Sequence, residues 1–148
     1  MNLKILIPFQ IFAEKTGIVR VVAGNYAGVK GAARTFTPIT MLDVRLNAKG
    51  RADFSFNPND NTALLLMKGS VIVNGDREVR TNDFVLFSRQ GGEIAVEAKA
   101  EDAHLLILSG QPIDEPIAQY GPFVMNTESE IRQAITDFNA GKFGELDD

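Results

Sequence analysis

The chain has 148 residues, of which 45% are hydrophobic and 23% charged, a balance typical of a globular protein of one domain. Its 15 basic and 19 acidic residues leave a formal net charge of −4, and the basic residues are scattered, so no nucleic-acid contact is expected. The lack of cysteine excludes disulfide frameworks and thiolate metal sites. Met1 to Phe12 are not expected to form a signal peptide, and no segment reaches the roughly 18 apolar residues of a membrane span, so a cytoplasmic protein without membrane contact is expected.

Short strands separated by turns make up most of the predicted structure. Residues 1–16 are expected to contribute an N-terminal strand, because Leu3, Ile5 and Ile7 alternate as strand residues do. The apolar or alternating segments that follow predict strands over Ile18–Ala23, Met41–Leu46, Arg51–Phe56, Ala63–Met67 and Ser70–Val73. The glycine-rich stretch after the first of these is interpreted as a loop, since its spacing fits neither a dinucleotide-binding motif nor a P-loop.

Asn74-Gly75 is the strongest hairpin signal in the chain, because both central residues of a type I′ turn need positive φ angles. It would join Ser70–Val73 to a strand over Arg77–Val79. Further strands are predicted over Asp83–Phe87, Glu93–Ala98 and His104–Ser109. About eight or nine short strands at regular spacing predict an all-β sandwich or barrel.

The C-terminal part differs in pattern. Gly110–Pro122 contains three prolines and is expected to run extended across a surface. Thr127 and Glu130 form a capping-box pattern at the start of a helix predicted over residues 127–140. The apolar face of that helix would carry Ile131, Ala134, Ile135 and Phe138.

Few residues suggest a catalytic or metal-binding role. His104 is the sole histidine, and transition-metal sites generally recruit several nitrogen or sulfur ligands, so neither a metal site nor a cofactor is expected. His104 is interpreted as a partly exposed histidine at the start of an apolar strand, and no catalytic residue is assigned. Phe54, Leu65 and Met67 are expected to line the interior of the barrel, where any core needs apolar side chains.

Several segments resemble the C-terminal domain of the pirin family. The longest is YGPFVMNTESEIRQAITDFNAGKFG over Tyr120–Gly144, and TPITMLDVRL over Thr37–Leu46 is a second. The glycine stretch Gly24–Lys30 and the segment Gly69–Gly75 also match that domain. The resemblance covers about Gly17 to Gly144 and implies an all-β, cupin-type double-stranded β-helix or jelly-roll barrel with one C-terminal α-helix. Residues 1–148 are expected to form a single domain, although Met1–Lys15 match no part of the family.

The resemblance also limits the expected function. Pirins are two-domain cupin proteins whose N-terminal cupin holds a metal through three histidines and one glutamate, whereas the C-terminal cupin lacks that set. The segment Asp53–Val73, where a cupin would carry those ligands, contains no histidine. The expectation is therefore a metal-free binding or interaction module, not itself an enzyme, that forms a homodimer. The alternatives are half of a pirin-type flavonol (quercetin) dioxygenase that needs a separate metal-bearing cupin, and a shortened gene product without a present role.

A cupin that normally faces another domain should expose an apolar patch when it is alone, because such patches usually mark interfaces. Two short segments are the candidates for the dimer interface. Their residues are Leu3, Ile5, Ile7, Pro122, Phe123 and Met125.

Overall fold

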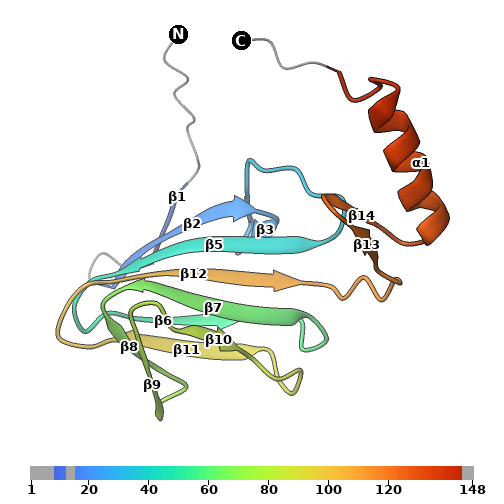
Figure 1. Cartoon of the computed structure of the whole chain (residues 1–148). Helices are drawn as coiled ribbons and strands as arrows, with labels where there is room; N and C mark the ends of the chain where they lie inside the picture. Colours follow the sequence, from blue (N-terminus) through green and yellow to red (C-terminus); the bar gives the residue numbers. More distant parts are fainter. Residues whose placement is uncertain (1–8, 13–15, 145–148) are drawn as a thin grey trace, which may run out of the picture. The chain divides into compact units, whose positions relative to one another are not determined.

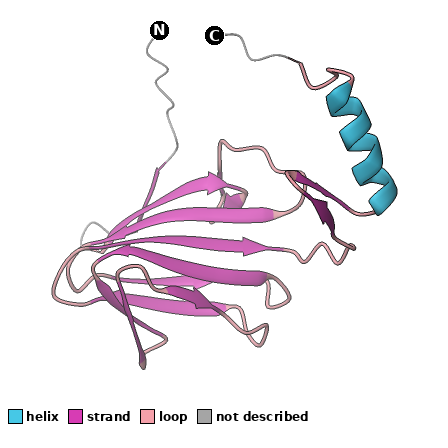
Figure 2. Cartoon of the chain, in the orientation of Figure 1, coloured by secondary structure: helices cyan, strands magenta, loops and turns pink. Residues whose placement is uncertain are grey.

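The computed structural model describes residues 9–12 and 16–144, and it divides into two compact units, Met1–Pro112 and Ile113–Asp148. Figure 1 labels the elements, and Figure 2 shows that strands dominate the first unit while the helix belongs to the second. The strands of the first unit are β1 (Phe9–Phe12), β2 (Gly17–Ala23), β3 (Asn25–Tyr26), β4 (Val29–Lys30), β5 (Ile39–Leu46), β6 (Arg51–Ser55), β7 (Asn61–Lys68), β8 (Ser70–Val73), β9 (Arg77–Arg80), β10 (Phe84–Leu86), β11 (Glu93–Ala98) and β12 (Ala103–Gly110). The second unit contains β13 (Ala118–Tyr120), β14 (Phe123–Met125) and α1 (Glu128–Asn139).

Two antiparallel sheets enclose the core of the first unit. The larger sheet has the strand order β1-β2-β5-β12-β7-β10, and the smaller one has the order β6-β11-β8-β9. One cluster of buried side chains joins them, with Leu42, Leu64 and Leu105 from the larger sheet and Phe54 and Val96 from the smaller. The predicted all-β cupin-type fold with one C-terminal helix is confirmed.

Alternation in β5 sets which face of the larger sheet is buried. Leu42, Val44 and Leu46 point inward and are almost completely buried, as the pattern of the sequence predicts. In β7 the assignment of Leu65 and Met67 to the barrel interior is wrong, because both lie on the opposite face from the fully buried Leu64 and Leu66.

The glycine-rich stretch after β2 contains a short hairpin where the sequence predicts only a loop. β3 and β4 form a small antiparallel hairpin in which Tyr26 pairs with Val29. Its two turn residues, Ala27 and Gly28, both have positive φ angles of 49° and 80°. A positive φ is unfavourable for alanine, so the sequence gives little indication of this turn.

The second unit is a hairpin with a helix. β13 and β14 pair antiparallel around Gly121, so the expected extended run over Gly110–Pro122 is only partly right. The capping box is confirmed, since the Glu130 amide donates to Thr127 Oγ1 at 3.3 Å and the Thr127 amide donates to Glu130 Oε2 at 2.8 Å. Within the described residues, the chain contains no helix with the length and apolar character needed to cross a bilayer.

The turn between β8 and β9 provides a test of the hairpin prediction. Asn74 and Gly75 have φ angles of 51° and 83°, and Val73 pairs with Arg77, so Asp76 also belongs to the turn. We expect Gly75→Val to lower the free energy of unfolding by about 1 kcal/mol or more, because a β-branched residue resists positive φ. A Cβ at Gly75 would meet nothing within 4 Å, so the cost is conformational. Urea unfolding should place the midpoint of the control Gly75→Asn close to that of the wild type, since asparagine tolerates positive φ. Equal midpoints for Gly75→Val and Gly75→Asn would contradict the assignment of the turn.

Candidate functional site

A group of three ionisable side chains lies on the outer face of the larger sheet, away from the core. Asp43 of β5 is its centre and is only 6% exposed. The Arg20 guanidinium of β2 forms an ion pair with Asp43 Oδ2, and Nε2 of His104 in β12 lies 2.6 Å from Asp43 Oδ1. The two partners are half-buried, with side chains 33% and 30% exposed.

Strand register brings these three residues together. Arg20 lies opposite Asp43 in the β2–β5 pair, and Leu106, next but one to His104, lies opposite Asp43 in the β5–β12 pair. Residues that are two apart on a strand share a face, so the His104 ring reaches diagonally to Asp43. A carboxylate with so little access to water is tolerated because both of its oxygens have charged or hydrogen-bonding partners.

The arrangement orients an imidazole, and the hydrogen-bond partner of its Nε2 among the described residues is the Asp43 carboxylate, not a serine or threonine hydroxyl. Ser109 is on the same strand as His104, five residues further on, which corresponds to roughly 16–17 Å along a strand. It also points inward, since alternate residues of β12 are buried. Ser109 therefore does not complete a nucleophilic triad with Asp43 and His104.

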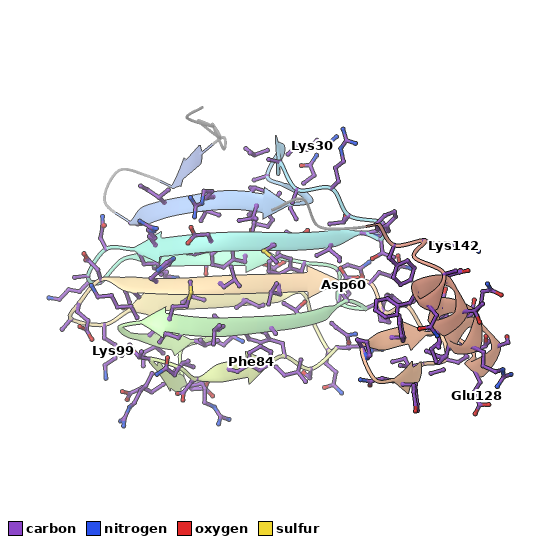
Figure 3. All side chains as sticks on the ribbon, turned by 45° about the horizontal axis from the view of Figure 1, so that its top comes forward. Lys30, Asp60, Phe84, Lys99, Glu128 and Lys142 are labelled. Atoms are coloured by element: carbon purple, nitrogen blue, oxygen red, sulfur yellow. The ribbon has the colours of Figure 1, made fainter. Side chains whose placement is uncertain are left out.

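A second polar group lies at one end of the barrel. Thr62 of β7 and Ser109 of β12 are buried and share a hydrogen bond of 2.8 Å between their hydroxyls. The Ser109 hydroxyl also lies 3.5 Å from Asp60 Oδ2, and Figure 3 shows Asp60 at the opposite end of the sheet from Lys99. A small cavity of about 100 Å³ is lined there by residues that include Phe56, Thr62 and Phe87.

Tyr26 lies close to this end of the barrel. Its ring centroid is 6.1 Å from that of Phe54 and 5.7 Å from that of Phe56. Burial of the phenol raises the pKa of Tyr26 above its ordinary value of 10.0; the hydrogen bond that its oxygen accepts from the Ser55 amide opposes this, and the charge of Glu93 adds to it. Tyr26 therefore stays neutral at physiological pH and offers no anionic base.

Apolar side chains make up most of the described barrel interior. The inward side chains of β6, β7 and β8 include Phe54, Leu64, Leu66 and Val71, all fully buried and apolar, where a metal needs nitrogen or oxygen ligands. Among the residues that the structure describes, no three histidine, aspartate or glutamate side chains gather closely enough to hold a metal ion. His104, the single histidine of the chain, lies on the outer face instead.

The candidate interface residues of the sequence fall into two groups. Leu3, Ile5 and Ile7 lie outside the described residues. In the second unit, Pro122 is exposed in the β13–β14 turn, while Met125 is half-buried and pairs with Ala118.

Phe123 packs within its own unit. Its ring centroid lies 6.1 Å from that of Phe138 and 6.3 Å from that of Phe143. Phe123 thus helps to hold the hairpin against the helix.

The group formed by Arg20, Asp43 and His104 was not predicted from the sequence. A lone aspartate among alternating apolar residues of β5 is the only sequence signal for that group.

Comparison with known proteins gives consistent matches. The family model described as the pirin C-terminal cupin domain matches residues 41–144. A Pseudomonas aeruginosa protein is 39% identical over 130 residues, which cover 88% of this chain and 45% of that protein. Human pirin is 31% identical over 136 residues, covering 88% of this chain and 47% of pirin.

Comparison with solved structures agrees with these sequence matches. A crystal structure described as quercetin 2,3-dioxygenase from Acinetobacter baumannii superposes with a TM-score of 0.85 at 40% sequence identity. The match covers 95% of this chain and 49% of that one. The chain thus spans about half the length of the relatives that it matches.

Proposed function

The chain belongs to the pirin family, and from this premise we propose that it acts as a metal-free cupin module that binds another protein chain. The observation that carries the proposal is the mostly apolar interior of the barrel: among the described residues no three histidine, aspartate or glutamate side chains gather to hold a metal ion, and the one histidine faces outward. We further propose that the module works in the cytoplasm as a homodimer.

A second candidate function has its own support. The relatives are about twice as long as this chain, and one similar solved structure is described as a quercetin 2,3-dioxygenase. The chain could then be one half of a flavonol dioxygenase whose metal is held by a separate cupin chain. In that case this half contributes binding surface, and the oxidative chemistry belongs to the other chain.

The two functions are separated by one set of measurements. We expect the chain, purified without chelator and incubated with iron, nickel or manganese, to hold far less than one metal ion per chain by elemental analysis. It should also show no turnover of quercetin. His104→Ala should leave both results unchanged, because the ring lies against Asp43 on the outer face.

Two outcomes would change the conclusion. Near one metal per chain, lost in His104→Ala, would overturn the metal-free proposal. Turnover that appears only when a metal-bearing cupin chain is added would support the half-enzyme function. The same metal-bearing cupin assayed alone is the control.

A further inference from the structure

Three basic side chains lie in one row across the outer face of the larger sheet. Arg45 of β5 lies opposite His104 of β12, and His104 lies opposite Lys68 of β7. Ile18 of β2, 42% exposed, lies opposite Arg45 and completes the row. The row crosses the end of the sheet at which β12 begins, to the left in Figure 1. Neighbouring strands are about 4.8 Å apart, so roughly 10 Å separates the backbones of Arg45 and Lys68.

A β-bulge places Lys68 on this face. Leu66 is fully buried, so regular alternation along β7 would turn Lys68 inward as well. The pairing of β7 with β12 shifts between His104 and Leu105, which leaves Met67 as the extra residue of β7. Lys68 is therefore exposed beside His104. Bulges often re-aim a side chain, and this one brings a second permanent cation into the row.

The two permanent cations of the row are not neutralised by a neighbour. Neither Arg45 nor Lys68 forms an ion pair with any residue that the structure describes. The buried carboxylate of the next row, Asp43, already has Arg20 at one oxygen and His104 at the other. Like charges that are neighbours on one face of a sheet destabilise it, and a bound anion would offset that cost.

His104 lies deeper in the face than the two cations beside it. Its side chain is 30% exposed, whereas Arg45 and Lys68 are exposed. Asp43 holds the ring against the sheet, with Nε2 of His104 2.6 Å from Asp43 Oδ1. A held ring between two long, flexible side chains leaves space above it that both side chains can reach.

A hollow of about 420 Å³ is lined by all four residues of the row. Its volume lies within the range of about 300–1,000 Å³ that is usual for small-molecule sites. Asp102 is the acidic residue of the lining, and its Oδ1 accepts a hydrogen bond from the Ala48 amide at 2.8 Å. Two cations against this one carboxylate leave the lining with a net positive charge even when the imidazole is neutral.

We propose that this hollow binds a phosphate monoester of a small organic compound, with the phosphate held between Arg45 and Lys68. A phosphate monoester has three terminal oxygens and close to two negative charges at pH 7, so it can accept hydrogen bonds from both cations at once. A carboxylate has only two oxygens, and the guanidinium fork of one arginine can take both. The organic part of the ligand lies against Ile18, because the phosphate, the size of a few water molecules of roughly 30 Å³ each, fills only part of the hollow.

Isothermal titration calorimetry of the purified full-length chain with phenyl phosphate tests the proposal, in a chloride buffer without phosphate or sulfate. We expect saturable one-to-one binding by the wild type and at least tenfold weaker binding by Arg45→Gln/Lys68→Gln. The matched control is Lys30→Gln/Arg34→Gln, which removes two exposed cations elsewhere, changes the net charge equally and should bind within twofold of wild type. Circular dichroism checks that each variant is folded, and Lys68→Gln alone serves if the double variant is not.

Other results would overturn the proposal. Absence of saturable binding by the wild type rejects the site, and an equal loss in Lys30→Gln/Arg34→Gln reduces the effect to net charge. Phenol or benzoate bound as tightly as phenyl phosphate rejects the phosphate class, and inorganic phosphate bound as tightly rejects the organic part. The proposal does not depend on the binding of another protein chain or on the metal and turnover measurements, so each can fail separately.

Discussion

Phe54→Ala is expected to lower the free energy of unfolding by about 3–5 kcal/mol, the usual cost of removing a large buried aromatic side chain. Phe54 is fully buried on β6, and its ring lies within 6.5 Å of the rings of both Tyr26 and Phe56, measured between centroids. Removal of the ring loses its transfer free energy and leaves a cavity between the two sheets. The cavity cannot close easily, because β6 is held by its pairing with β11 along its whole length.

Phe36→Ala is the matched control for this change. Phe36 lies in the segment before β5 and is fully exposed, so the same substitution removes no buried surface there. Its effect should stay within about 0.5 kcal/mol of wild type. Urea denaturation followed by circular dichroism measures both variants, and similar midpoints for the two would contradict the position of Phe54 in the core.

Gly92→Ala is expected to cost roughly 2–3 kcal/mol or more, as overpacking does when backbone must move. A Cβ on Gly92 would lie 2.1 Å from the carbonyl oxygen of Phe56. Relief by a side-chain movement is impossible, because the obstacle is backbone and the Phe56 amide is itself hydrogen-bonded to the Gly92 carbonyl at 2.8 Å. The strain would fall on the connection that leads into β11.

Gly110→Ala provides the comparison. A Cβ there meets its nearest atoms at 3.5 and 3.7 Å, which is ordinary van der Waals contact. Thermal unfolding should therefore place Gly110→Ala near wild type and Gly92→Ala well below it. If both variants melt together, the close approach of Gly92 to Phe56 is not present in the protein.

Much of the fold follows from local pattern, and the failures have a physical cause. Strict alternation in β5 identifies its buried face. The run Ala63–Met67 has no polar residue to mark the outer face, and that face is itself apolar, so Leu65 and Met67 could not be assigned correctly. The hairpin of β13 and β14 was not predicted because the segment Gly110–Pro122 has three prolines, of which only Pro122 belongs to the hairpin and lies in its turn, where proline is well tolerated.

The group on the outer face is harder to predict. Asp43 and His104 are 61 residues apart, and their contact depends on the register between β5 and β12. A one-residue slip would move one of them to the opposite face. Sequence pattern fixes the period of each strand but not the pairing between strands distant in the chain, so the group appears only in the folded sheet.

The central position of β12 has a consequence for how the first unit assembles. β12 lies between β5 and β7 and pairs with each over most of its length, yet it is the last strand of that unit in the chain. During synthesis, residues 39–46 and 61–68 emerge well before their shared partner at residues 103–110. Until then both strands have an unsatisfied edge, which is the kind of surface that associates wrongly with other chains. Completion of the sheet is therefore a late, long-range event, and folding should be slow for a protein of this size.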